Sequence, residues 1–151
     1  MTRPPIIALL SLALLSPALA QPPGTGGGGP QARIASKTAR FTSVKRTEKR
    51  FKDSLEAANL AAATSRKGKT ASFHGKVARV FSPQSGRVVI LNFHEDYKKA
   101  VVAVVQKENF PAFPDLKPLE GKEVLISGEV TLYQERPQVV LRKPDQVWLV
   151  E

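Results

Sequence analysis

The chain has 151 residues, 23 of them basic and 13 acidic, which gives a formal net charge of +10, and 42% of its residues are hydrophobic. This length leaves room for one domain with extensions and excludes a multidomain enzyme. The sequence has no cysteine, so disulfide crosslinks and thiol chemistry are both excluded.

The first twenty residues have the pattern of a secretory signal peptide. Arg3 supplies the positive charge, residues 6–15 form a short apolar run, and residues 18–20 are a small-x-small cleavage site. We expect cleavage between Ala20 and Gln21 and export to the periplasm or the extracellular space. A membrane anchor is the alternative, but the run is shorter than the ~20 residues that a spanning helix needs. We therefore expect no stable membrane insertion after cleavage.

Residues 21–42 are predicted to be a disordered linker, first rich in Gly and Pro and then basic. Its opening sequence QPPGTGGGGPQ cannot bury apolar surface. From Arg33 to Lys69, eleven basic residues face three acidic residues, a net charge of +8. The positive charge of the chain is thus concentrated before the region of strand-like sequence.

Residues 43–68 are predicted to form one basic amphipathic helix. Apolar side chains recur at helical spacing on one face, and an alanine-rich stretch favours a helix further; they are Val44, Phe51, Leu55, Ala58 and Ala62. Gly68 stands where a left-handed cap belongs. The opposite face would carry Lys45, Arg46, Lys49 and Arg50, able to approach phosphates. The alternative is a solvated helix whose charge is partly paired between residues four apart, such as Lys49 and Asp53.

Strand-like segments follow at short intervals. The first covers residues 73–81 with a break at Gly75, and the next two cover 87–94 and 100–106, with turns between them. Residues 107–120 contain three prolines, too many for a long helix. Residues 121–146 alternate as a β-hairpin, in which Gly128 indicates a bend or a close backbone approach. Residues 147–150 are predicted to add an edge strand.

Three strands, an irregular link and two more strands give the order of the OB-fold, a five-stranded Greek-key barrel. Five stretches carry the resemblance: residues 74–77, 91–93, 119–124, 127–130 and 133–141. Residues 71–151 resemble nucleic-acid-binding OB domains of the anticodon-binding type, especially the compact exported bacterial versions. The resemblance implies an all-β barrel with an added N-terminal basic helix. The chain differs from the usual pattern in its proline-rich link, where many OB-folds carry a helix.

The resemblance implies that a ligand lies across strands two and three, flanked by the first and last loops. Single-strand binders combine a positive groove with aromatic faces on which bases stack. The candidates in the domain are Lys76, Arg79, Arg87, Asn92, Lys98, Lys99, Tyr133 and Arg136. Residues 70–151 carry only +1, from eleven basic and ten acidic residues, so the basic helix should supply most phosphate contacts. Phe81 and Phe93 are interpreted as core residues.

Sequence patterns of catalysis are weak. His74 and His94 are far apart and have no partner at zinc spacing. The run His94-Glu95-Asp96 suits a solvated turn better than a metal site. The sequence contains no nucleophile motif, phosphate loop or dinucleotide fingerprint. We expect a protein that is not an enzyme and needs no cofactor or metal.

The favoured interpretation is an exported OB-fold protein that binds a polyanion, with single-stranded DNA or RNA as the leading candidate. Two alternatives stay open. One is a structural or protein-interaction module with a partner in the cell envelope, and the other is an accessory subunit of an extracellular nuclease. Charge placement and the salt dependence of binding separate the three.

Overall fold

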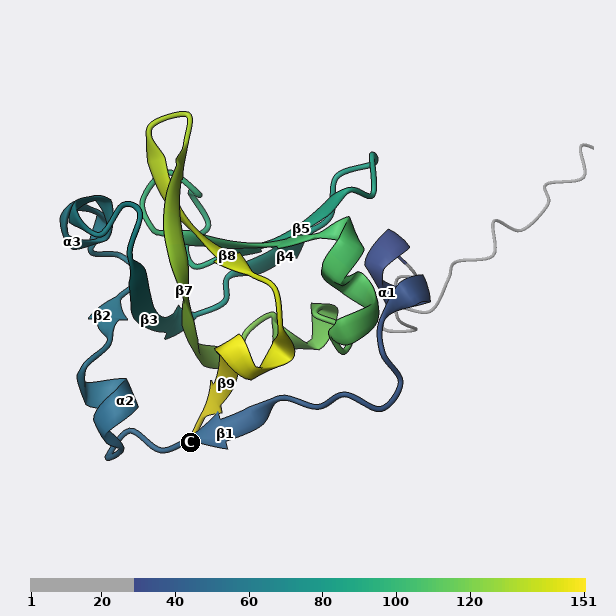
Figure 1. Cartoon of the computed structure of the whole chain (residues 1–151), viewed down its shortest axis with the longest axis horizontal. Coiled ribbons are helices and arrows are strands. Elements are labelled where there is room, and N and C mark those ends of the chain that lie inside the picture. The colour runs from purple at the N-terminus through teal and green to yellow at the C-terminus, as the bar shows by residue number, and fades with distance from the viewer. Residues whose placement is uncertain (1–28) are drawn as a thin grey trace, which may run out of the picture.

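The computed structural model describes residues 29–151, which form a mostly β structure with a few short helical segments (Figure 1). The strands are β1 (Thr42–Val44), β2 (Leu55–Glu56), β3 (Thr70–Lys76), β4 (Arg79–Phe81), β5 (Val88–Asn92), β6 (Val102–Gln106), β7 (Glu123–Tyr133), β8 (Arg136–Leu141) and β9 (Val147–Val150). The α-helices are α1 (Pro30–Ile34), α2 (Lys49–Lys52) and α3 (Leu60–Ser65). The 3-10 helices are η1 (Lys107–Ala112), η2 (Lys117–Leu119) and η3 (Pro144–Gln146).

The strands form one curled sheet. β4 pairs with β5 and β5 with β6, both antiparallel, and β6 runs parallel to β8. β8 pairs antiparallel with β7, which pairs antiparallel with β3. Only Val77 and Ala78 separate β3 from β4, so this ladder begins and ends on the same stretch of chain. β9 extends the sheet from β7, and β1 is added parallel to β9.

The core fills the inside of the curl. Inward side chains alternate along the strands, as in Phe73 of β3, Leu91 of β5 and Ile126 of β7, all fully buried. The link between β6 and β7 contributes Phe110 and Phe113, which are also fully buried. Each such side chain contributes about 1.5–3 kcal/mol through burial. The proline-rich link therefore contributes to the core. Its helical structure is limited to η1 and η2, which agrees with the short irregular crossover predicted from its prolines.

The predicted strands after residue 70 are confirmed, with small shifts in their ends. The segment 73–81 becomes β3 and β4, the two apolar runs become β5 and β6, and the hairpin becomes β7 and β8. Gly128 is the predicted close approach, because a Cβ there would lie 2.6 Å from the Val140 carbonyl oxygen. Residues 147–150 form β9, but this strand has partners on both sides and the sheet edge is β1.

The single helix predicted for residues 43–68 is wrong. This stretch contains β1, α2, β2 and α3 in succession. Val44 is buried in the β1–β9 ladder, and β2 pairs with β3, so pairing with available sheet edges outweighs the modest helical preference. Side chains that compete with helical hydrogen bonding divide the stretch: the Ser54 hydroxyl donates to the Phe51 carbonyl, and the Asn59 carboxamide caps α3. Gly68 has the predicted left-handed conformation, with φ of 78°.

The disorder predicted for residues 21–42 is wrong where the structure describes that stretch, from residue 29 onward. The Gln31 side chain of α1 is only 4% exposed, and it donates to the Pro114 carbonyl and accepts from the Leu116 amide. The Ser36 amide donates to the Phe113 carbonyl. The Gln31 side chain and the Ser36 backbone amide thus tie this stretch to the link between β6 and β7, which the Gly/Pro composition did not indicate.

The predicted signal peptide, the cleavage site at Ala20 and Gln21, and the glycine run up to residue 28 lie outside the described residues. Among the helices of residues 29–151, none is long and apolar enough to cross a membrane.

Candidate functional site

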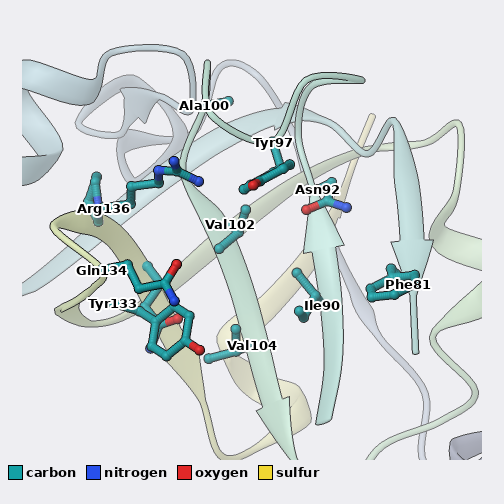
Figure 2. Close-up of a pocket in the computed structure, with 12 residues that line it drawn as sticks. Phe81, Ile90, Asn92, Tyr97, Ala100, Val102, Val104, Tyr133, Gln134 and Arg136 are labelled. Atoms are coloured by element: carbon teal, nitrogen blue, oxygen red, sulfur yellow. The ribbon is translucent and has the colours of Figure 1, made fainter. Parts of the chain in front are cut away.

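A groove of about 250 Å³ lies between the outer face of strands β4, β5 and β6 and the tip of the β7–β8 hairpin (Figure 2). Its lining is mostly apolar and aromatic. The residues that line it are Phe81, Ile90, Asn92, Tyr97, Ala100, Val102, Val104, Tyr133, Gln134, Arg136, Pro137 and Gln138. The groove has an apolar floor, an aromatic rim and a few polar groups, which is the usual composition of a ligand-binding site.

The floor of the groove consists of two neighbouring rows of side chains, set by the strand register. In the first row Phe81 lies opposite Ile90, which lies opposite Val104. In the second row the register places Arg79, Asn92, Val102 and Gln138 side by side across β4, β5, β6 and β8. We call these the apolar row and the polar row. Directly opposed residues point to the same face of a sheet, so both rows face the groove.

Exposed aromatic side chains border the groove. Phe81 is 40% exposed, Tyr97 52% and Tyr133 63%. Among residues 29–151, the only other exposed large hydrophobic side chain is Ile34, at 39%. Single exposed apolar residues need no explanation, but an exposed cluster around a groove is typical of a binding surface.

Cations lie against two of these aromatic rings, Tyr97 and Phe81. The Arg136 guanidinium carbon is 4.9 Å from the centroid of the Tyr97 ring, and that of Arg79 is 5.5 Å from the centroid of Phe81. The Lys98 ammonium is 5.9 Å from the Tyr97 centroid. Figure 2 shows the Tyr97 ring between Arg136 and Asn92. Hydrogen bonding to Arg136 and its charge, with a smaller effect of Lys98, lower the pKa of the Tyr97 hydroxyl.

The hairpin tip has an unusual backbone. Gln134 and Glu135 have φ of 49° and 64°, in the left-handed region that non-glycine residues rarely adopt. A two-residue hairpin turn with positive φ at both positions normally contains Asn-Gly or Asp-Gly. Tyr133 and Arg136 form the strand pair on either side of this turn, so the strained turn positions both side chains at the groove.

The structure brings together part of the predicted site. Asn92, Tyr133 and Arg136 line the groove, Arg79 is in its polar row, and Lys98 lies next to Tyr97. Lys99 is in the same turn, where its amide donates to the Asp96 carbonyl.

Two of the candidates predicted within residues 70–151 lie elsewhere. Lys76 lines a different hollow together with His94 and Glu120. Arg87 precedes β5 at the end of that strand opposite to Asn92. The positions of Lys76 and Arg87 in the sequence did not distinguish them from Arg79 and Arg136, which reach the groove.

The predicted cationic residues Lys45, Arg46, Lys49 and Arg50 do not reach the groove. They belong to the segment from β1 to α2, which lies at the end of the molecule opposite to the hairpin tip (Figure 1). Arg46 forms an ion pair with Glu123, Lys49 with Asp53, and the Arg50 guanidinium carbon is 4.9 Å from the Trp148 ring centroid. We call residues 42–53 the basic segment. Three of its five cations thus have partners, whereas no ion pair found in residues 29–151 involves Lys45 or Lys52.

Sequence reasoning missed several groove residues. Phe81 is exposed and was interpreted as core, whereas Phe93 is buried as predicted. The alternation of Arg79, Val80 and Phe81, with Val80 buried, would have indicated that Phe81 shares the face of Arg79. No sequence pattern indicated that Tyr97 and Gln138 line the groove. The position of Tyr97 depends on the conformation of a turn, and that of Gln138 depends on the β6–β8 register.

The two histidines form hydrogen bonds with nearby groups. Ser54 Oγ is 2.7 Å from His74 Nδ1, but this hydroxyl also donates to the Phe51 carbonyl. His94 Nδ1 accepts from the Asp96 amide within an exposed turn. In the part of the chain that the structure describes, no group of three His, Asp or Glu side chains could hold a metal ion.

No protein-family model and no curated protein matches this sequence. Among solved structures, the chain is similar to an OBody, AM2EP06, bound to hen egg-white lysozyme, with a TM-score of 0.42 and 16% identity over 64% of this chain and 92% of that chain. It is also similar to an aspartyl tRNA synthetase from Entamoeba histolytica, with a TM-score of 0.46 and 14% identity over 77% of this chain and 27% of that one. Likenesses this distant assign no family and no function.

Proposed function

We propose that this protein is an exported, non-enzymatic protein of the OB-fold type that binds single-stranded nucleic acid in the groove. The sequence pattern of residues 1–20 supports export. The fold and the ligand are supported by separate observations of the described residues.

The strand pairing supports a five-stranded Greek-key barrel. When β3 and β4 are counted as one bent strand, the ladder β3–β7–β8–β6–β5–β4 is a closed ring of five strands. In such a barrel the face of strands two and three, with the loops beside it, is the usual ligand surface. Here those strands are β5 and β6, whose outer face is the floor of the groove.

The observation that carries the proposed ligand is the cluster of exposed aromatic rings with cations beside them. Phe81, Tyr97 and Tyr133 offer faces to unstacked bases, and Arg79, Lys98 and Arg136 offer charges to the phosphates between those bases. Stacking of a base on an aromatic side chain contributes about 1–3 kcal/mol. Bases of a duplex are already stacked and paired, so the groove fits a single strand.

Fluorescence anisotropy with labelled DNA and RNA at several salt concentrations tests this proposal. We expect a single strand to bind more tightly than a duplex of the same sequence. Tyr133→Ala should weaken single-strand binding by about 1–3 kcal/mol without changing its salt dependence, because stacking releases no counterions.

Ile34→Ala is the matched control, since Ile34 is 39% exposed on α1 and does not line the groove. This variant should bind like the wild type. If no single strand binds even at low salt, the proposed function is wrong and an interaction module of the cell envelope becomes the better account.

A further inference from the structure

We propose that the turn between α3 and β3 is a second phosphate-binding site, reached by a single strand that leaves the groove across β8 and β7. We call residues 66–69 the basic turn, because its sequence is Arg66-Lys67-Gly68-Lys69. This inference rests on the proposed function and extends the bound strand beyond the groove. It follows from the position of the turn on the sheet, from its charge and from the surface between the turn and the groove.

The basic turn is held against β7 by a β-bulge. Gly68 has a φ of 78°, and its amide donates to the Val130 carbonyl over 2.8 Å. The Val130 amide donates to the Lys69 carbonyl over 2.9 Å. Two residues thus oppose one, with a glycine in the left-handed conformation, which is the arrangement of a G1 bulge. The Lys69 amide also donates to the Arg66 carbonyl over 2.9 Å, so the backbone of the turn is fixed by pairing at both ends.

The basic turn lies close to the polar row of the groove. Thr131 follows Val130 in β7 and pairs with Gln138 of β8, which lines the groove. Because β7 lies between β8 and β3, two strand spacings of about 4.8 Å, roughly 10 Å in all, separate the turn from Gln138. Figure 1 shows α3, which leads into the turn, near the end of the molecule that carries the hairpin tip. A strand leaving the groove over β8 and β7 therefore arrives at the basic turn.

The surface between the groove and the basic turn is polar and neutral at its centre. Gln138 Nε2 donates to Thr131 Oγ1 over 3.1 Å, so these two side chains form the crossing. The next residue of β7 on the same face is Glu129, which lies opposite Thr70 of β3. Its carboxylate is 3.6 Å from the Arg142 guanidinium, so a cation partly balances this charge. Phosphates can cross here without a strong repulsive field.

The cations of the basic turn are available to a ligand. Arg66, Lys67 and Lys69 are exposed, and the ion pairs found in residues 29–151 include none of them. The sequence has no acidic residue between Glu56 and Glu95, so the turn has no carboxylate near it along the chain. It also has no aromatic side chain on which a base could stack. The basic turn therefore offers charge to phosphates and leaves stacking to the groove.

Binding of two strand lengths tests the second site, with labelled oligothymidylates of roughly 4 and roughly 12 nucleotides, within the range that one such barrel covers. Lys67→Gln/Lys69→Gln should lower the slope of log affinity against log salt for the longer strand by about 1.4, since each phosphate contact of a single strand contributes about 0.7. The shorter strand fills only the groove and should keep its slope. Fluorescence anisotropy at several salt concentrations measures both.

Lys45→Gln/Lys52→Gln is the matched control. It also removes two exposed lysines that belong to no ion pair found in residues 29–151, but from the basic segment. This variant should keep the wild-type slope with both strands. An equal fall of the slope in the two double variants would show a general charge effect and overturn the second site.

The remaining outcomes separate the two proposals. If Lys67→Gln/Lys69→Gln binds the longer strand with the wild-type slope, the second site is wrong while binding in the groove stands. An equal change for both strand lengths also overturns the inference, because the turn would then not lie beyond the groove. If neither strand binds the wild type, the proposed function itself fails. Thermal melts of each variant ensure that a changed slope is not a lost fold.

Discussion

The groove and the basic segment contain the same kinds of side chain and use them differently. Each places arginines against aromatic rings: Arg136 on Tyr97 in the groove, and Arg50 on Trp148 beside the basic segment. In the groove the rings remain exposed, and the ion pairs found in residues 29–151 involve none of its cations. In the basic segment Phe51 packs against His74, with ring centroids 4.6 Å apart, and Arg46 pairs with Glu123. Cations next to aromatics thus indicate a binding surface only where the rings and the charges are left available.

The largest expected effect concerns stability in the basic segment. Val44 is 1% exposed in β1, so Val44→Ala should lower the free energy of unfolding by about 2–3 kcal/mol through lost burial and a cavity. Thermal or denaturant unfolding measures this. Val102→Ala, on the groove floor, should cost less, because Val102 is only half-buried. An equal loss of unfolding free energy in both variants would contradict the expected difference in burial between the two regions.

The next largest effect concerns the salt dependence of binding and the arginines responsible for it. Arg136→Gln should weaken single-strand binding and lower the slope of log affinity against log salt by about 1, as for one lost phosphate contact. Arg50→Gln removes the same charge from the basic segment and should leave that slope unchanged. Salt titrations of both variants by anisotropy give the comparison. If only Arg50→Gln lowers the slope, the phosphate contacts are made by the basic segment and not by the groove.

A smaller effect is expected at the hairpin tip. Glu135 has a φ of 64°, so Glu135→Gly should remove backbone strain and stabilise the fold by about 0.5–1 kcal/mol. Asp53→Gly, at a φ of −82°, should instead destabilise the basic segment, because it adds freedom to the unfolded chain and removes the ion pair with Lys49. Denaturant unfolding of both variants tests whether strain is confined to the groove.

The smallest effect is a pH dependence of binding. The pKa of Tyr97 is lowered, mainly by Arg136, so this hydroxyl ionises at a pH below its ordinary value of about 10. The phenolate would compete with phosphate for Arg136, and affinity should fall as the pH rises toward that value. Tyr97→Phe cannot ionise and should lose less affinity over the same range. Identical pH profiles for wild type and Tyr97→Phe would show that this hydroxyl does not face the ligand.

The sequence predicts the strands well and the site only in part, for physical reasons. Alternation locates β5, β6 and the β7–β8 hairpin because half of each strand is buried, and a close backbone approach requires Gly128. Helical spacing misleads in residues 43–68, because the edges of β3 and β9 compete for that stretch. Charge counting directed attention to the basic segment, whereas Tyr97 and Gln138 reach the groove only through tertiary pairing.

The pairing of β1 with β9 also bears on how the chain folds. Thr42 lies opposite Trp148 and Val44 opposite Val150, so this ladder joins segments from far apart in the sequence. Contacts of such long separation close late and slow the search for the native state. During synthesis, β1 has no partner until residues 147–150 have emerged, and β7 lacks its β9 neighbour for the same time. Until then the nascent chain carries open strand edges, which can pair with other chains.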